Sequence, residues 1–224
     1  FEKQDVRSVM GALIYLVKTK LPEYIGTSPF EIQVLTPMRK GELGVEHLNE
    51  VLQYYLNPAS ESKKEKEGRT GVFREGDKVM QVKNNYKLEW KITNAKGFSV
   101  EEGLGVFNGD MGVIKQINTY SERITVVFDE NREVEYPYSN LDELELAYAI
   151  TIHKSQGSEY PAVVLPLLSG PPILCNRNLL YTAITRAQKC AAIVGRQSMV
   201  EQMIHNETEQ KRYSGLNECL KDGI

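Results

Sequence analysis

The hydrophobic pattern of this chain changes its period twice, and this change limits the possible folds more than any other feature. Buried strands of the kind found in a parallel sheet are predicted at 31–36, 146–152, 162–165 and 191–194. Between the first two of these segments, the alternation of apolar and polar residues typical of antiparallel strands occurs at 78–82, 112–117, 124–128 and 133–136. The two patterns together predict an α/β domain that is interrupted by a small antiparallel β-barrel.

The predicted α/β domain is discontinuous: it covers residues 1–86 and 146–224, and the inserted barrel covers 87–145. Apolar residues at helical spacing predict helices at 5–19, with Asp5 as the N-cap, and at 45–56, 177–187 and 197–205. Residues 59–71 are rich in Ser, Lys, Glu and Gly, which predicts a mobile loop.

Composition excludes few classes of function. The net charge of −3 argues against a simple basic nucleic-acid-binding module, but a motor protein needs only a few placed cations in a cleft. No apolar run approaches the length of a membrane span, and no signal peptide is visible, so we expect a cytoplasmic protein. The chain begins at Phe1 without an initiator Met, and we expect it to be part of a longer protein. Its three cysteines, Cys175, Cys190 and Cys219, are far apart, so we expect free thiols and no metal site.

The first segment with candidate chemistry is 151–159, which follows a predicted buried strand and leads into a predicted helix. It holds Thr151, His153, Lys154 and Gln156 on one turn. Backbone amides at the start of a helix, with hydroxyl and ammonium donors nearby, are suited to phosphate oxygens. A polar loop at the end of a strand, with no ligand, explains the same residues about equally well.

The second segment is 181–187, in which Arg186 lies among small apolar residues just before a predicted buried strand. An arginine at this position can extend its head group to solvent or pair with an acid. Its planar guanidinium can also act as an arginine finger, which stabilises the charge on a phosphoryl group during transfer.

Five segments in order along the chain carry a resemblance to a known family. Residues 149–157 resemble the fifth motif of superfamily 1 helicases, and residues 180–187 resemble the sixth. Residues 33–41, with Gly44, Leu48 and Asn49 behind them, resemble the fourth motif as RecD-type enzymes have it. The segments 76–86 and 106–112 also look RecD-like. The chain is therefore similar to the C-terminal portion of RecD/TraA-type DNA helicases, the exodeoxyribonuclease V alpha-subunit type.

The resemblance implies a protein with two RecA-like lobes, ATP between them, and single-stranded DNA that crosses both. This chain would be the second lobe, with an inserted Src-homology-3-like barrel. The implied function is ATP-driven translocation on single-stranded DNA, 5′ to 3′, with unwinding of the duplex. The implied partners are the DNA strand, the upstream lobe of the same chain and other recombination and repair subunits, with no membrane.

The resemblance also implies roles for individual residues. Arg186 would face the γ-phosphate of ATP from across the cleft, as the catalytic residue. The nucleotide side would further include Gln156, Gly157, Glu159 and, as a phosphate contact, Arg39. The DNA side would include Thr151, His153 and Lys154, with Asn84, Tyr86 and Asn108 where the barrel joins the lobe. For these last three, a turn amide, the tip of a core ring and a turn cap are equally good explanations.

The sequence departs from the family in one respect: it has no G-x-x-x-x-G-K-[ST] phosphate loop. ATP and Mg²⁺ would therefore be anchored mainly by an upstream lobe, and this chain alone should be inactive. Residues 124–130 imitate a magnesium-binding Walker B strand, but Asp129 and Glu130 are more simply the tip of a hairpin. Two other functions remain open: an RNA helicase of the same superfamily, and a non-catalytic module for DNA binding or protein docking.

Overall fold

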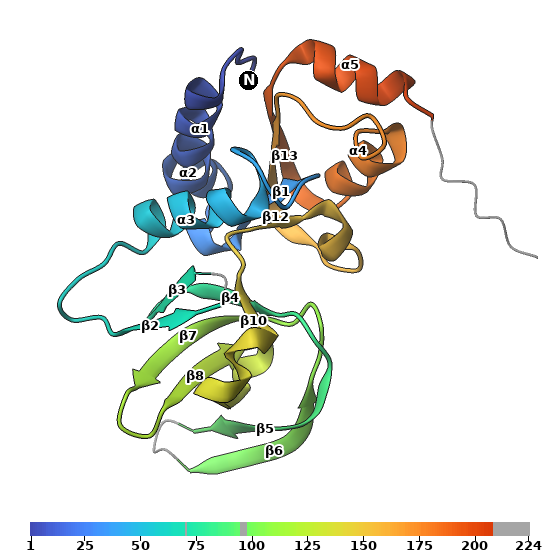
Figure 1. Cartoon of the computed structure of the whole chain (residues 1–224). Helices are drawn as coiled ribbons and strands as arrows, with labels where there is room; N and C mark the ends of the chain where they lie inside the picture. Colours follow the sequence, from blue (N-terminus) through green and yellow to red (C-terminus); the bar gives the residue numbers. More distant parts are fainter. Residues whose placement is uncertain (70, 95–97, 208–224) are drawn as a thin grey trace, which may run out of the picture.

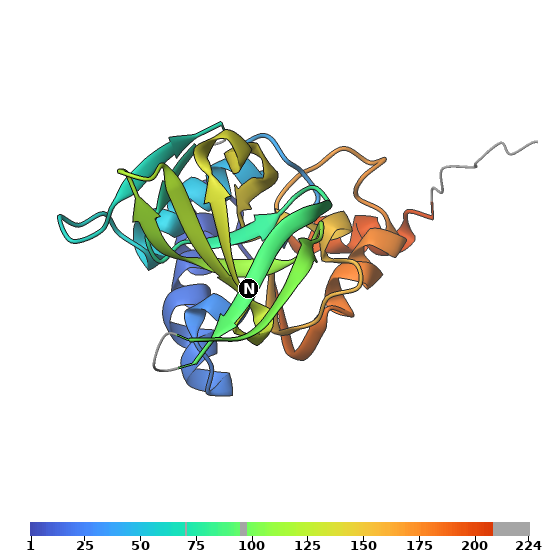
Figure 2. The same cartoon turned by 90° about the horizontal axis from the view of Figure 1, so that it is seen from below.

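The computed structural model describes residues 1–69, 71–94 and 98–207. In these residues an α/β unit lies against an antiparallel barrel, and the two are joined by the segment between β10 (Leu144–Leu146) and β11 (Ala149–Thr151) (Figure 1). Figure 2 views the molecule from the barrel side, with the α/β unit behind it. This architecture confirms the predicted interrupted α/β domain.

A four-stranded parallel sheet forms the centre of the α/β unit. Its strand order is β11-β1-β12-β13, where β1 is Ile32–Thr36, β12 is Tyr160–Leu167 and β13 is Ala187–Gly195. All five residues of β1 are buried, because the sheet is covered on both faces. The parallel sheet with flanking helices confirms the predicted α/β class of this unit.

The helices form a layer on each face of the sheet. On one face lie α1 (Val6–Tyr15), α2 (Leu21–Ile25) and α3 (Val45–Leu56), and on the other lie α4 (Arg177–Ile184) and α5 (Gln197–His205) (Figure 1). Asp5 caps α1, since its carboxylate accepts a hydrogen bond from the Ser8 amide at 2.9 Å. A π-helical turn over Leu16–Lys20 links α1 to α2, so the helix predicted at 5–19 continues further than its spacing indicated.

The barrel is a seven-stranded antiparallel sheet with the strand order β10-β4-β7-β8-β9-β5-β6. Its strands not yet introduced are β4 (Lys78–Gln81), β5 (Asn85–Thr93), β6 (Ser99–Val106), β7 (Met111–Asn118), β8 (Arg123–Phe128) and β9 (Glu133–Pro137). A short 3-10 turn, Asp129–Asn131, joins β8 to β9. Asp129 and Glu130 therefore lie at a hairpin tip, as predicted, and form no Walker B strand.

Three boundaries differ from those predicted. The barrel sheet includes β4 and so begins at Lys78, before the expected position 87, because β4 pairs with β10 and β7. The predicted strand 146–152 is divided: Leu146 ends the barrel, and Ala149 begins the parallel sheet. The segment 59–71 is not a loop throughout, since β2 (Glu65–Gly68) pairs with β3 (Gly71–Arg74).

Buried polar groups connect the barrel to the α/β unit at the start of β4. Asp77 is fully buried, and its carboxylate accepts four hydrogen bonds. The donors are Gln53 Nε2 at 2.6 Å, the Arg74 amide at 2.6 Å, Asn57 Nδ2 at 2.7 Å and the Tyr148 hydroxyl at 3.0 Å. Such complete pairing is what allows a carboxylate to be buried.

The neighbouring Lys78 is also buried, with a side chain that reaches from the barrel into the α/β unit. Its Nζ donates to the Phe30 carbonyl at 2.7 Å and to Gln33 Oε1 at 2.8 Å. Gln33 Nε2 in turn donates to the carbonyls of Ala147 at 3.1 Å and Tyr148 at 3.2 Å, in the segment that crosses between the two sheets. Burial lowers the pKa of Lys78 from 10.5 to about 8.

We expect Lys78 to make the stability of the protein depend on pH. The unfolded chain keeps the ordinary pKa of 10.5, so between about pH 8 and pH 10.5 it binds more protons than the folded chain, and the free energy of unfolding rises with pH. From about pH 7.5 to about pH 9.5 the Lys78 contribution should rise by about 2 kcal/mol. Urea unfolding of the wild type and Lys78→Met at both pH values measures it. A difference in the free energy of unfolding between the two proteins that does not change with pH would contradict the lowered pKa of Lys78.

Candidate functional site

The predicted site residues lie at two opposite edges of the parallel sheet. Thr36 at the carboxyl end of β1 pairs with Thr151 at the carboxyl end of β11. At the other edge, Tyr160 and Ala187 pair at the amino ends of β12 and β13. Since all four strands are parallel, the segment 152–159 must run from the first edge back to the second. The predicted fifth motif, residues 149–157, therefore begins at the carboxyl edge and leads toward the amino edge.

At the amino edge, Arg186 is held by backbone carbonyls and by a hydroxyl. Its Nε donates to the Thr182 carbonyl at 3.3 Å, its Nη1 to the Ser158 carbonyl at 3.1 Å, and its Nη2 to Thr185 Oγ1 at 3.4 Å. No ion pair within the part of the chain that the structure describes includes Arg186. A half-buried guanidinium with fixed orientation and no carboxylate partner is suited to an anionic ligand.

Gly157 and Glu159 flank Ser158, whose carbonyl accepts the hydrogen bond from Arg186, whereas Gln156 directly follows the 3-10 turn over Ile152–Ser155 as its C-cap. Gly157 has a φ of 89°, which favours glycine and turns the chain toward β12. Gln156 and Glu159 are exposed, and Glu159 accepts only a 3.3 Å hydrogen bond from Gln188 Nε2. Of the three predicted residues, Gly157 and Glu159 are thus next in sequence to the residue that contacts Arg186.

At the carboxyl edge, Thr151 caps a 3-10 turn over Ile152–Ser155, which stands in place of the helix expected here. The Thr151 hydroxyl accepts a hydrogen bond from the Lys154 amide at 3.3 Å, and His153 is exposed. Because the turn is only four residues long, it positions side chains and offers no extended row of helix-terminal amides.

Arg39 lies at this carboxyl edge too, away from Arg186. Its Nη2 pairs with Glu145 Oε1 at 2.9 Å, and Lys154 Nζ lies 3.4 Å from Glu145 Oε2. Burial alone would raise the pKa of Glu145, but Arg39 and Lys154 outweigh it and leave the pKa below its ordinary value. The sequence grouped Arg39 with the nucleotide-side residues, whereas the structure groups it with Lys154.

Arg39 and Lys154 line a cleft of about 360 Å³ between the α/β unit and the barrel. Lys83 and Arg69 add two further cations, and Asp142 and Glu145 are the acids of the lining. The sequence analysis missed Lys83, Arg69 and Glu145. Lys83 stands directly before Asn84 in the RecD-like segment 76–86, and that position was the available signal.

A small group of predicted site residues lies at one end of the barrel. Asn84 and Tyr86 follow Lys83 in sequence, and Asn108 contacts Asn84. The Asn108 amide donates to Asn84 Oδ1 at 2.9 Å. The Tyr86 ring meets the Phe107 ring edge to face, with their centroids 5.6 Å apart, and both rings are exposed, Tyr86 by 67%. Tyr86 is therefore not a core residue, and Phe107 is a site residue that the sequence analysis missed. Two exposed rings beside a basic cleft are suited to stacking with nucleic-acid bases.

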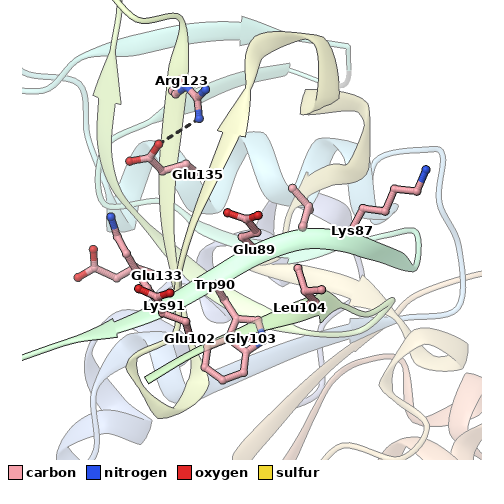
Figure 3. A pocket seen from close by; sticks show the side chains of 11 residues that line it. Lys87, Glu89, Trp90, Lys91, Glu102, Gly103, Leu104, Arg123, Glu133 and Glu135 are labelled. Carbon is pink, nitrogen blue, oxygen red and sulfur yellow. Dashed lines mark hydrogen bonds and ion pairs between the residues drawn. The ribbon is translucent and has the colours of Figure 1, made fainter. Parts of the chain in front are cut away.

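A second hollow, a groove of about 620 Å³, lies on the barrel around Trp90 (Figure 3). The indole lies against Gly103, where any Cβ would come within 2.3 Å of a ring carbon. Charges of both signs line the groove, and they include the ion pair between Arg123 and Glu135 at 3.1 Å. This mixture of charges indicates no single class of ligand.

Two classes of site are absent from the described ranges. No group of three or more His, Cys, Asp and Glu residues among them is arranged to hold a metal ion. None of their helices has the length and apolar character needed to cross a membrane. Cys175 and Cys190 are free thiols, and Cys219 lies outside the described residues.

Comparison with known families assigns both parts of the molecule. Residues 48–128 match the family described as the SH3 domain of ATP-dependent RecD-like DNA helicases. Residues 146–194 match the UvrD-like helicase C-terminal domain. The first match covers most of the barrel and most of α3 before it, and the second includes both Thr151 and Arg186.

Curated relatives agree with these matches. The chain is 40% identical over 160 residues to the ATP-dependent RecD2 DNA helicase of Deinococcus radiodurans, a match over 71% of this chain and 19% of that protein. It is 30% identical over 191 residues to the RecBCD enzyme subunit RecD of Mycolicibacterium smegmatis, over 85% of this chain and 29% of that protein. The chain thus spans less than a third of the length of either relative.

Among solved structures, a Pif1 helicase from Bacteroides with ADP-AlF3 and single-stranded DNA aligns with 96% of this chain and 54% of its own, with a TM-score of 0.49 and 16% identity. This likeness is too distant to bear on function. The match to the SH3 domain falls on most of the barrel, and the match to the UvrD-like domain falls on three strands of the parallel sheet. The chain belongs to the RecD-like helicases, of which it holds the SH3 domain and the UvrD-like C-terminal domain.

Proposed function

We propose that this chain is the second motor lobe of an ATP-dependent helicase that moves along single-stranded DNA and unwinds duplexes. The observation that supports this proposal most strongly is that cationic side chains lie at opposite ends of the strands of the parallel sheet. One edge holds Arg186, which pairs with no carboxylate among the described residues. The opposite edge opens into a basic cleft, and its lining residue Lys83 precedes by three residues the exposed ring of Tyr86. A motor needs these two sites apart, because it binds nucleotide and strand at once.

At the amino edge, Arg186 would stabilise the charge on the γ-phosphate of ATP, with Gln156, Gly157 and Glu159 beside it. The residues fit this role because the guanidinium is already oriented by three acceptors and keeps N–H groups for a phosphate oxygen. ATP supplies the free energy for movement when it is bound. The 224 residues contain no phosphate loop, so we propose that an upstream lobe anchors ATP and Mg²⁺.

At the carboxyl edge, the proposed path of the DNA strand passes Thr151, His153 and Lys154. It continues through the cleft with Arg39 and Lys83, and reaches Asn84, Asn108 and the rings of Tyr86 and Phe107. Cations would contact phosphates, and the rings would stack on bases whatever their sequence. Arg39, which the resemblance put on the nucleotide side, is assigned to the strand because of its place beside Lys154.

We expect Arg186→Ala in the complete protein to lower ATP turnover by about 10³- to 10⁵-fold, with DNA affinity nearly unchanged. Arg186→Lys should restore little, because an ammonium cannot reproduce the planar fork of donors. Steady-state ATPase rates and strand titrations at fixed salt measure both effects. Arg177→Ala is a suitable control, since Arg177 is exposed and its side chain pairs with the exposed Glu207. Near-normal turnover in Arg186→Ala would refute the assignment, and a lower melting temperature with both activities reduced would make Arg186 a structural residue.

We expect Tyr86→Ala and Phe107→Ala each to weaken binding of single-stranded DNA by about 5- to 100-fold. The salt dependence of binding should stay the same, because neither ring carries a charge. Fluorescence anisotropy with a labelled oligothymidylate at several salt concentrations measures both quantities. Tyr120→Ala is the matched control: Tyr120 is 98% exposed and follows β7 at the end away from Phe107. Equal affinities for all four proteins would contradict a stacking role.

A further inference from the structure

Three of the cations that line the basic cleft are paired with acids from one short segment of the barrel. Lys83 pairs with Asp142, and both Arg39 and Lys154 pair with Glu145. The cations come from the α/β unit and from the strand connection after β4, while the acids come from the segment that ends the barrel. Two of the four positive charges that line the cleft are therefore balanced from within the protein.

Glu145 is the centre of this arrangement because it contacts two cations at once. Its Oε1 lies 2.9 Å from Arg39 Nη2, and its Oε2 lies 3.4 Å from Lys154 Nζ. The side chain is 19% exposed, and its backbone is fixed by the pairing of Glu145 with Met80 in β4. A phosphodiester has the same charge and the same two oxygens to offer, and arginine binds either group through paired hydrogen bonds.

We propose that Glu145 occupies the place of a backbone phosphate between Arg39 and Lys154, and that a single strand of nucleic acid displaces it on entering the cleft. This inference rests on the proposed function, since it assigns the regulation of the proposed strand-binding site. The barrel thus carries an internal competitor for the strand. When the strand replaces it, the contacts of β10 with the loops after β1 and β11 are released.

Internal competition has two measurable consequences. First, part of the attraction between strand and cations is used to replace Glu145, so the wild-type affinity is lower than the cations alone would provide. Second, Arg39 and Lys154 hold a carboxylate in place of mobile counterions, so fewer counterions are released when the strand binds. The wild type should therefore show weaker salt dependence than a variant without this carboxylate.

The test is binding of a fluorescein-labelled oligothymidylate to the 224-residue chain, measured by anisotropy at several salt concentrations. Glu145→Gln keeps the size of the side chain and removes its charge. We expect it to tighten binding about tenfold at low salt and to steepen the slope of log K against log salt by about 0.7 to 1.4, the change in slope that one or two fully neutralised phosphates would give. Glu145→Asp, whose shorter side chain reaches the two cations less well, should be intermediate.

Glu135→Gln is the matched control, because it also neutralises a glutamate that pairs with an arginine, in the separate groove around Trp90 (Figure 3). It should leave affinity and slope unchanged. Arg39→Ala and Lys154→Ala separate the two levels of the proposal. If both weaken binding while Glu145→Gln binds no more tightly than the wild type, the competitor role is wrong and Glu145 is a positioning residue. If neither weakens binding, the proposed strand path is wrong as well.

Discussion

The chain crosses from one sheet to the other through two buried residues, Ala147 and Tyr148, and the rest of the structure depends on how this crossing is held. The Ala147 amide donates to the Lys78 carbonyl in β4 at 2.8 Å, and the Tyr148 carbonyl accepts from the Val34 amide in β1 at 3.3 Å. Side-chain amides add further bonds, and this pairing matters because an unpaired buried peptide group costs about 1–3 kcal/mol. The side-chain amide of Gln33 donates hydrogen bonds to the carbonyls of Ala147 and Tyr148. The side-chain amide of Asn49 donates to the carbonyls of Leu146 and Ala149 and accepts from the Ala149 amide. These amides fix where the barrel ends and where the parallel sheet begins.

This fixed crossing explains why the two proposed sites keep their relation to one another. β10 and β11 are almost continuous in sequence, so Glu145 on the barrel and Thr151 on the sheet are only a few residues apart. The segment 152–159 then leads from Thr151 to the edge where Ser158 contacts Arg186. Under the proposed function, this one stretch of chain links the strand-binding cleft to the ATP side. A displacement of either site would therefore be transmitted to the other along the backbone.

Periodicity was sufficient to predict the parallel sheet, the barrel strands β7, β8 and β9, and the hairpin at Asp129, because these barrel strands alternate between buried and exposed residues. It did not predict β5 and β6, whose residues are mostly exposed or half-buried. It predicted a strand at 78–82 but did not fix the barrel boundary before it, since all four residues of β4 are buried and such a strand fits either sheet. It could not place Arg39 either, because its partner Glu145 lies 106 residues away and no local pattern reports that contact. Phe107 was missed for the same reason, since its ring contact is with Tyr86, which lies 21 residues earlier in the chain.

The most direct measurement is a crystal structure of the complete protein with an oligothymidylate and a nonhydrolysable ATP analogue. The account predicts that the terminal phosphate of the analogue lies within hydrogen-bond distance of the Arg186 guanidinium. It also predicts that a backbone phosphate of the strand lies between Arg39 and Lys154. A strand that runs past Arg186, or a nucleotide bound in the cleft beside Lys154, would contradict the separation of the two sites across the sheet.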